Sequence, residues 1–300
     1  MASLSYTFQE PFNLRKTFEC GQIFRYVPAN NFKTVYAPIR NRVVKIIQKS
    51  PKKLEIQSNR LEGLETLMDS FLRVDDNYKE MLEEIAIDTL MKKISSHCRG
   101  LRLLKQDLFE CMFSFILSQC SNIPRIKKNL STLVQDYGRK VNYENRRFYL
   151  FPTPEMLKGC DEEIFREMGF GYRAKYLSRI IDSCPDFLEN KKSGEKFCLD
   201  CSLDTEELNK KLKSIYGVGQ KVSDCVQLFA AGDLRLFPVD TWMKKFMKKY
   251  YCTQKKVSER KIRHKGQELF GKWAGYAQEF IFYYARTEEV FEKPKKPQKG

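Results

Sequence analysis

The stretch Ser214-Ile-Tyr-Gly-Val-Gly-Gln-Lys-Val-Ser-Asp-Cys225 joins two predicted helices. Ahead of it, apolar residues at helical spacing predict a helix that Asp204 can cap: Leu208, Leu212 and Ile215. Behind it, the apolar residues between Val222 and Phe229 predict a second helix, which Gly232 can end. The connection is short, and its two glycines permit positive φ. The sequence therefore predicts a helix-hairpin-helix at about residues 205–232.

A hairpin of this kind directs the free backbone N–H groups of its second helix outward. A phosphate group can bind there with help from the helix dipole. We therefore expect Gly217, Gly219 and Val222 to contact the backbone of a nucleic acid without reading its bases. The alternative is an αα-turn that only packs, since Gly-x-Gly alone is a weak signal.

Two ionisable side chains follow the hairpin glycines. Lys221 lies at the start of the second helix, where a positive charge opposes the helix dipole, so helix stability does not explain it. Asp240 ends Pro238-Val-Asp240 and precedes a further predicted helix. An aspartate in that position is most often only a helix N-cap.

Composition favours a polyanionic partner. The 300 residues include 54 Lys and Arg against 38 Asp and Glu, which gives a formal net charge of +16. Each phosphate that a basic side chain neutralises releases condensed counterions, so nucleic acid is the leading candidate. The alternative is a basic protein whose lysines are merely solvated.

Several features bear on the compartment. The ten cysteines are scattered, Met1 to Glu10 lacks the pattern of a secretion signal, and no apolar run is long enough to cross a membrane. We expect a soluble monomer in a bacterial cytoplasm or a nucleus, neither secreted nor attached to a membrane.

The rest of the chain predicts an α+β protein. Three short β-rich segments predict an antiparallel sheet: Phe24–Val27, Val43–Ile47 and Leu54–Ile56. Helical spacing dominates from Leu64 to Arg286, whereas Asn142–Pro154 shows no clear period and is assigned to a connection. We expect a sheet domain over residues 1–95 packed on a mostly helical domain over 96–290, with a disordered basic tail at 291–300.

The hairpin followed by Pro238-Val-Asp240 resembles the helix-hairpin-helix, Gly-Pro-Asp superfamily of DNA glycosylases. Within that superfamily the chain is similar to the 8-oxoguanine DNA glycosylase/AP lyase family. Five further segments carry the resemblance in order: Cys20-Gly-Gln-Ile-Phe-Arg25, Leu104-Lys-Gln-Asp-Leu-Phe-Glu-Cys111, Ser121-Asn-Ile-Pro-Arg-Ile126, Gly169-Phe-Gly-Tyr-Arg-Ala-Lys-Tyr176 and Trp273-Ala-Gly-Tyr-Ala-Gln-Glu-Phe-Ile-Phe282. Matched segments in the same order are more specific than any one of them alone.

The resemblance implies a bifunctional enzyme of base excision repair that flips 8-oxoguanine out of duplex DNA and excises it. Lys221 matches the nucleophile of the family, and Asp240 matches its essential carboxylate. A neutral amine can attack C1′ of the sugar and displace the base, and the resulting Schiff base permits β-elimination. The carboxylate stabilises the positive charge that develops on the sugar.

The resemblance also implies a base pocket. Gly21 matches the residue whose carbonyl accepts the N7–H of 8-oxoguanine, and Gln278 matches the side chain that reads the Watson–Crick edge. Cys225 and Phe282 match the two faces of a sandwich around the flipped base. Taken alone, Gly21 is a turn glycine and the other three are core residues more often than not.

A last group matches residues that probe the opposite strand: Asn122, Arg125, Tyr172 and Arg173. Arginine at such positions can donate to cytosine or bind phosphate. The chain departs from the family at Cys120-Ser121, where Asn-Asn is frequent, and at Trp242, where His is frequent. The first departure weakens the expected selectivity for cytosine, and the second removes one expected phosphate contact.

Other members of the superfamily fit less well. Those with a four-cysteine iron–sulfur cluster carry it after the catalytic region, where this chain has only Cys252, and glycosylases for alkylated bases lack the lysine. Cys198 and Cys201 have the spacing of zinc ligands but no second pair, so we expect neither a metal nor a cofactor. Two alternatives stay open: a non-catalytic DNA-binding module, and a glycosylase of the same superfamily with another base specificity.

Overall fold

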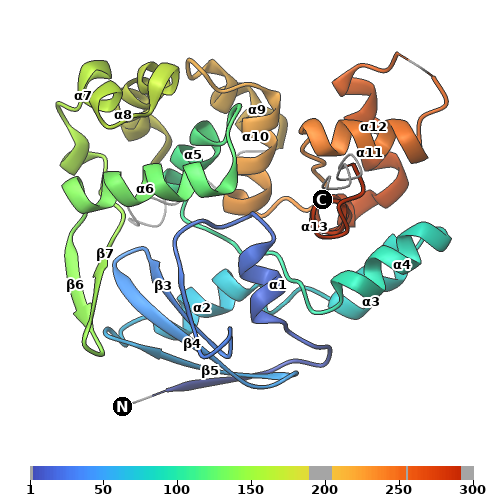
Figure 1. Ribbon diagram of the computed structural model, residues 1–300, viewed down its shortest axis with the longest axis horizontal. Helices are drawn as coiled ribbons and strands as arrows, with labels where there is room; N and C mark the ends of the chain where they lie inside the picture. Colours follow the sequence, from blue (N-terminus) through green and yellow to red (C-terminus); the bar gives the residue numbers. More distant parts are fainter. Residues whose placement is uncertain (1–2, 189–204, 255, 292–300) are drawn as a thin grey trace, which may run out of the picture.

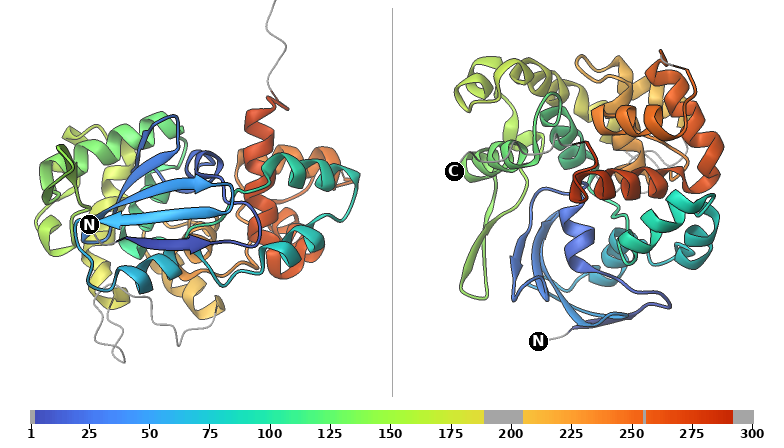
Figure 2. Two further views of the ribbon diagram at one scale, coloured as in Figure 1. Left: turned by 90° about the horizontal axis from the view of Figure 1, so that it is seen from below. Right: turned by 45° about the vertical axis from the view of Figure 1, so that its right-hand side comes forward.

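An antiparallel sheet forms the N-terminal part of the protein. The computed structural model describes residues 3–188, 205–254 and 256–291. Five strands make up the sheet: β1 (Leu4–Thr7), β2 (Val27–Ala29), β3 (Thr34–Ile39), β4 (Arg42–Ser50) and β5 (Lys53–Ser58). Their order is β1-β5-β4-β3-β2, and every neighbouring pair is antiparallel (Figure 2).

The sheet is held by its own apolar core. Strands β3 and β4 are rich in the β-branched and aromatic residues that pack well on a pleated surface. Two helices contribute to the same core, α1 (Leu14–Glu19) and α2 (Leu64–Leu72). Phe18 of α1, Ile46 of β4 and Met68 of α2 are fully buried in one cluster. Burial of these faces fixes α1, and therefore the segment from Cys20 to Arg25 that follows it.

The rest of the described chain is mostly helical (Figure 1). Its α-helices are α3 (Tyr78–Ile85), α4 (Thr89–Cys98), α5 (Leu108–Leu117), α6 (Ile123–Tyr137), α7 (Glu162–Glu167), α8 (Ala174–Leu188), α9 (Thr205–Ser214), α10 (Gln220–Val226), α11 (Thr241–Tyr250), α12 (Glu259–Phe270) and α13 (Ala274–Thr287). Short 3₁₀ turns occupy Glu155–Leu157, Gly171–Arg173 and Gly271–Trp273.

Helix α5 is the central element of this body. Every residue from Leu108 to Leu117 except Glu110 is buried, so the helix is apolar all round, as expected for an element covered on every side. It packs against α6, α8 and α10. Figure 1 shows the α9–α10 pair between the group that contains α5 to α8 and the group formed by α11 to α13.

Helices α3 and α4 belong to the helical body by their packing. Helices α3 and α4 pack on α13, and their buried residues Met81 and Ile94 belong to the core of the helical body. Helix α3 and most of α4 lie in the predicted range 1–95 by sequence but pack in the core of the helical body, and the division at residues 1–95 and 96–290 stays a prediction.

The predicted fold class is confirmed: an N-terminal antiparallel sheet packs on a mostly helical body that contains the hairpin. One predicted strand, however, is wrong. Regular pairing begins only at Val27, and Phe24 and Arg25 are instead buried in a connecting segment. The Arg25 guanidinium pairs with Glu110 of α5 at 3.0 Å.

A second correction concerns Asn142–Pro154, which contains a β-hairpin rather than only a connection. Strands β6 (Lys140–Tyr143) and β7 (Arg146–Tyr149) pair antiparallel. Glu144 and Asn145 both have positive φ, as the tightest hairpin turns require. Tyr143 and Phe148 of the segment pack on Tyr36 of the main sheet, a contact that no local period reveals.

Some predictions fall outside the described residues: Asp204 as a cap, the Cys198–Cys201 pair, and residues 292–300 of the tail. Within the described ranges, no helix combines the length and the apolar character that a membrane crossing needs.

Candidate active site

The corner of the helix-hairpin-helix is clamped between α5 and α8. Gly217 has φ of +94°, and a Cβ atom at this position would lie 2.3 Å from Cγ of Tyr176. Both the conformation and the close approach require glycine. From the other side, Nε2 of Gln119 donates to the Gly217 carbonyl at 2.9 Å. The corner is therefore fixed by two elements that lie far from it in the sequence.

The second helix of the hairpin, α10, begins without a side-chain cap. Its N-cap residue is Gly219, whose backbone is extended. Nothing lies within 4 Å of the position that a Cβ of Gly219 would occupy. Val222 is buried. The helix ends at Gly232, with φ of +87°, after a π-helical turn over Gln227–Ala231 that the sequence did not predict.

Helix α10 is also fixed from the far side. Asp224 is buried and pairs with Nε of Arg263 on α12 at 2.9 Å, while Nε2 of Gln220 donates to its other oxygen at 2.9 Å. Burial raises the pKa of Asp224 to about 6, although the positive charge of Arg263 opposes this. These contacts fix α10, and therefore also the position of Lys221, which lies one turn before Asp224 on this helix.

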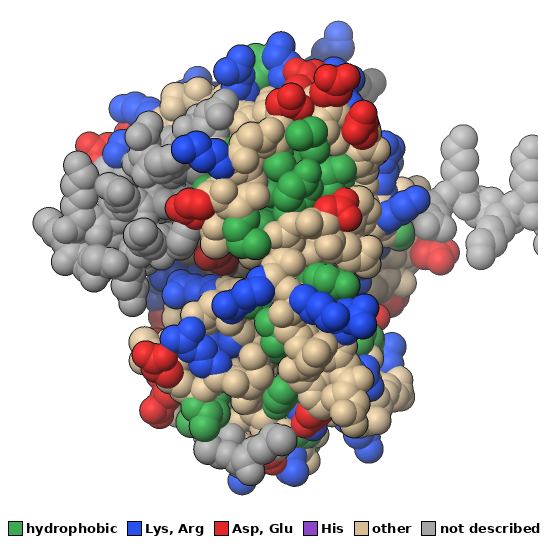
Figure 3. All heavy atoms as spheres, turned by 90° about the vertical axis from the view of Figure 1, so that its left-hand side faces the viewer, with side chains coloured by type: hydrophobic (Ala, Val, Ile, Leu, Met, Phe, Trp, Pro, Cys, Tyr) green, Lys and Arg blue, Asp and Glu red, His purple; other side chains and the backbone are tan. Residues whose placement is uncertain are grey.

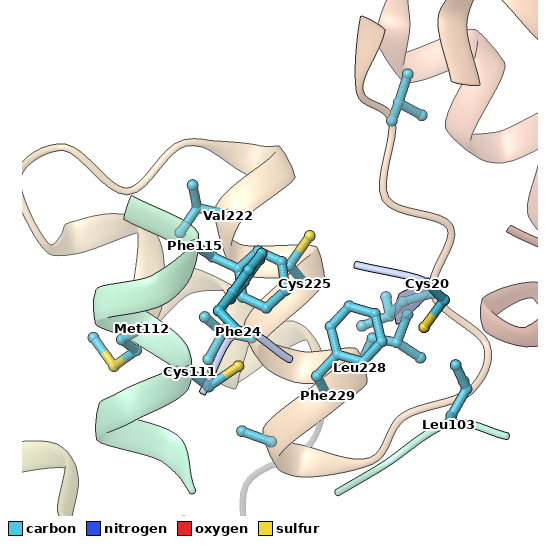
Figure 4. Close-up of a cluster of buried hydrophobic side chains, with 14 of the residues drawn as sticks. Cys20, Phe24, Leu103, Cys111, Met112, Phe115, Val222, Cys225, Leu228 and Phe229 are labelled. Carbon is cyan, nitrogen blue, oxygen red and sulfur yellow. The ribbon is translucent and has the colours of Figure 1, made fainter. Parts of the chain in front are cut away.

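Lys221 points from α10 toward the end of α5. Its Nζ atom donates to the hydroxyl oxygen of Ser118 at 2.9 Å and lies 5.0 Å from the centre of the Phe115 ring. The Ser118 hydroxyl in turn donates to the Phe115 carbonyl at 2.7 Å. Its single proton is therefore used, and its lone pairs face the amine. Figure 4 shows Phe115 beside Val222 and Cys225 of α10.

Asp240 is both a helix cap and a neighbour of the amine. Its Oδ1 accepts from the backbone N–H of Met243 at 2.7 Å at the start of α11. Burial raises the pKa of Asp240, while the bond from Met243 and the positive charge of Lys221 lower it. The predicted cap is thus confirmed, and the fold brings the carboxyl group within electrostatic reach of Lys221.

A second carboxyl group, from Glu279 on α13, lies in the same region. The side chain is 3% exposed, and Oε1 has no hydrogen-bond partner among the described residues. Burial raises the pKa of Glu279 to about 7; the thiol of Cys20 hydrogen-bonds to it, and the charges of Asp240 and Lys221 act on it. This residue was not among the predicted site residues, although a glutamate inside the apolar run Tyr276–Phe282 is a visible signal.

Of the residues expected to form a base pocket, Gly21 and Phe282 come into contact from distant parts of the chain. Gly21 has φ of +116°, and a Cβ there would lie 3.0 Å from Cε1 of Phe282. Gln278 is buried one turn before Phe282 on α13. Cys225 is buried on α10; burial raises its pKa to about 12, and the charges of Lys221, Asp240 and Glu279 also act on it.

The residues expected to face the opposite strand surround the loop after α5. Asn122 is exposed and caps α6, with Oδ1 accepting from the backbone N–H of Arg125 at 3.0 Å. Tyr172 is 44% exposed and its hydroxyl donates to the Gln119 carbonyl at 3.1 Å. Arg173 is 2% exposed and donates to the carbonyls of Gln119 and Cys120. In this structure Arg173 braces the loop, whereas Asn122, Arg125 and Tyr172 are open to solvent.

Gln119 and Ser118, which sequence analysis missed, connect these groups. Gln119 holds the hairpin corner with its side chain and accepts from Tyr172 and Arg173 with its carbonyl. Ser118 holds the Lys221 amine. Neither residue carries a recognisable signal in the sequence, because each acts through partners at least 50 positions away.

Positive side chains gather on the neighbouring surface. Figure 3 shows Lys and Arg in a band across the face that carries α6, α7 and the β6–β7 hairpin. Exposed basic residues of α6, β6, β7 and the turn between α6 and β6 are Arg125, Lys128, Arg139, Lys140, Arg146 and Arg147. Such a band attracts phosphate groups over about 10 Å at moderate salt.

Comparisons with known proteins agree with this architecture. Residues 5–112 match the family described as "8-oxoguanine DNA glycosylase, N-terminal domain", and residues 113–272 match the "HhH-GPD superfamily base excision DNA repair protein" family. A solved 8-oxoguanine glycosylase/lyase from Clostridium acetobutylicum, in complex with duplex DNA containing cytosine opposite 8-oxoguanine, superposes with a TM-score of 0.84 at 33% identity. The match covers 95% of this chain and 98% of that chain.

For two curated relatives, the match covers a larger share of this chain than of the relative. The N-glycosylase/DNA lyase OGG1 of Arabidopsis thaliana is 30% identical over 222 residues, which are 71% of this chain and 60% of the relative. The N-glycosylase/DNA lyase of Saccharomyces cerevisiae is 30% identical over 248 residues, 72% of this chain and 64% of the relative. The chain thus spans less than two thirds of the length of either.

Proposed function

Because this chain belongs to the 8-oxoguanine DNA glycosylase/AP lyase family of the helix-hairpin-helix, Gly-Pro-Asp superfamily, we propose that it is a bifunctional DNA glycosylase/AP lyase that excises 8-oxoguanine from duplex DNA. One observation carries the proposal: the amine of Lys221 and the carboxyl group of Asp240 lie within electrostatic reach of each other, beside an uncapped helix start. A hairpin that served only for packing or backbone binding would not need this pair.

The chemistry follows from the two groups. The neutral amine of Lys221 attacks C1′, the glycosidic bond breaks, and its electron pair leaves with the base. The Asp240 carboxylate stabilises the positive charge that develops on the sugar before the new C–N bond is complete. Ring opening gives a Schiff base, whose C2′ proton is lost as the bond to the 3′ phosphate breaks. Hydrolysis of the Schiff base then releases Lys221.

Recognition of the base is proposed for the residues that meet near Gly21. The Gly21 carbonyl accepts the N7–H that 8-oxoguanine has and guanine lacks, and Gln278 reads the Watson–Crick edge. Phe282 and Cys225 enclose the flipped base on its two faces. The contact between Gly21 and the Phe282 ring supports a shared pocket.

The remaining expectations concern the DNA and the cell. We propose that the backbones of Gly217, Gly219 and Val222 bind phosphate, and that Asn122, Arg125 and Tyr172 face the gap and the opposite strand, beside the loop that Arg173 braces. The exposure of Asn122, Arg125 and Tyr172 supports this assignment. The enzyme is proposed to act as a monomer in a bacterial cytoplasm or a nucleus.

Borohydride trapping tests the proposal directly. The wild-type protein is mixed with duplexes that carry 8-oxoguanine opposite each of the four bases, and excision, strand cleavage and covalent trapping are measured in parallel. Lys221→Gln is expected to bind lesion DNA without excision or trapping, and Lys211→Gln, an exposed lysine of α9, serves as the control. Binding without trapping by the wild-type protein would instead support a DNA-binding module. Trapping only on another lesion would support another base specificity.

A further inference from the structure

Arg286 lies near the end of α13 and contacts both segments that the proposed base pocket needs. Its Nη2 donates to the backbone carbonyl of Glu19, the last residue of α1. Its Cζ lies 5.3 Å from the centre of the Phe282 ring, one helical turn earlier. Its Nη1 lies 3.4 Å from the position that a Cβ of Gly21 would occupy. A single guanidinium therefore touches the loop that carries Gly21 and the ring that faces it.

The side chain is suited to this double contact. A guanidinium is planar and offers several donors in a fixed fork, so it can stack on a ring and donate in its plane at the same time. The face of an aromatic ring attracts a cation, and the attraction grows as water is excluded. Both Arg286 and Phe282 are half-buried. The Lys ammonium, a compact charge, can make one of these contacts well but not both.

The charged surroundings also favour a fixed position for Arg286. The charge of Arg286 acts on Glu279, seven residues earlier on α13, and opposes the effect of burial on the pKa of that carboxyl group. On the other side, Lys127 donates to the hydroxyl of Tyr26 at 2.9 Å, and its pKa is lowered by burial and further by the charge of Arg286. An attractive group on one side and a repulsive group on the other leave the guanidinium little freedom.

We propose that Arg286 is a positioning residue of the base pocket, which ties the Gly21 loop to the Phe282 ring through one guanidinium. The inference rests on the proposed function, because it assigns a role within the pocket that this function requires. When Arg286 is removed, the ring and the Gly21 carbonyl can move independently. Recognition of the flipped base should then suffer, while the Lys221–Asp240 pair keeps its geometry.

A purely structural role makes a different prediction. A positive side chain in the last turn of a helix interacts favourably with the helix dipole. Loss of that contribution lowers the stability of α13, which carries Glu279 as well as the pocket residues, so every activity of the enzyme would fall together. A role in the pocket affects only substrates that place a base in it.

The test compares a duplex carrying 8-oxoguanine with a duplex carrying an abasic site, for which the lyase step needs Lys221 but no base recognition. Arg286→Met keeps the length of the chain and loses the charge, and Arg286→Lys keeps the charge and loses the planar fork. The matched control is Lys93→Met. Lys93 of α4 lies 5.8 Å from the centre of the ring of Tyr284, which is on α13 like Phe282 but away from Gly21. Melting temperatures are recorded for all variants.

For Arg286→Met we expect kcat/KM on 8-oxoguanine to fall about tenfold, mainly through KM, with abasic-site cleavage within about twofold of the wild type. Arg286→Lys should recover part of the loss, and Lys93→Met should behave as the wild type. Excision by Arg286→Met at the wild-type rate, or an equal loss on both duplexes in the correctly folded Arg286→Lys variant, would overturn the inference. A wild-type protein inactive on both duplexes would instead reject the proposed function.

Discussion

The Nζ atom of Lys221 donates a hydrogen bond to the hydroxyl oxygen of Ser118 at 2.9 Å, across the contact between α10 and α5. Ser118 is the C-cap of α5 and donates its own proton to the Phe115 carbonyl. The position of the amine is thus set by the C-terminal end of α5, the central buried helix.

Ser118→Ala should slow the steps that need the amine without weakening DNA binding. Without its acceptor the Lys221 side chain gains rotamers, and we expect single-turnover cleavage of an abasic duplex to fall about tenfold. Ser178→Ala is the matched control, because the Ser178 hydroxyl also donates to a backbone carbonyl three residues earlier, on α8. Equal rates for Ser118→Ala and the wild type would show that Ser118 does not position the amine.

Substitutions at Asp240 should separate its two roles. Asn is as good an N-cap as Asp, so Asp240→Asn keeps the bond to the Met243 N–H but loses the negative charge. We expect excision to fall by about 100-fold or more with little change in melting temperature. Asp240→Ala loses the cap as well and should cost about 1 kcal/mol of additional stability. Excision and thermal unfolding are measured on the same preparations; an active Asp240→Asn would leave Asp240 as a cap only.

Gly217→Ala should destabilise the protein strongly. A Cβ would meet the Tyr176 ring at 2.3 Å, in addition to the strain of a φ of +94°. Gly159→Ala is a close control, because Gly159 has a φ of +93° with nothing within 4 Å of the added atom. In urea denaturation, Gly159→Ala should lose about 1 kcal/mol and Gly217→Ala at least about twice as much. Equal losses would mean that Tyr176 does not constrain the corner.

The buried Glu279 should make stability depend on pH. Its pKa is about 7 in the folded protein and 4.5 when unperturbed, with burial as the main cause. Both states are protonated below about pH 4.5, and only the unfolded state ionises readily as the pH rises toward 7, so the contribution of Glu279 to stability is lost over this window. The free-energy change is about 3 kcal/mol at most.

Glu279→Gln should remove this dependence. The neighbouring Cys20 thiol and the charges of Arg286, Asp240 and Lys221 also act on Glu279, and these groups remain in the variant. The free energy of unfolding of Glu279→Gln minus that of the wild type should therefore become more positive between pH 4.5 and 7 and then stay level. Glu268→Gln, an exposed site on α12, should give a flat difference. A flat difference for Glu279→Gln as well would mean that the pKa of Glu279 is the same in the folded and unfolded states.

Local features of the chain were accessible to prediction. The hairpin at residues 205–232 depends on glycines whose conformation is a property of single positions, and the Asp240 cap is a bond between residues three apart. The β6–β7 hairpin was missed because its aromatic residues pack on Tyr36, about a hundred positions earlier. The burial of Arg173 was equally hidden, since its partners are the carbonyls of Gln119 and Cys120.

The sequence by itself determined the helix-hairpin-helix, the placement of Lys221 at its second helix and the cap of α11, because each depends on neighbours within one or two helical turns. Only the tertiary structure decided that Ser118 contacts Lys221, that Glu279 lies near Lys221 and Asp240, and that Arg286 joins Glu19 to the Phe282 ring. Their contacts join segments that are separated by up to 267 positions in the chain, as for Arg286 and Glu19. Such contacts are selected by the packing of whole elements, which no short pattern of residues encodes.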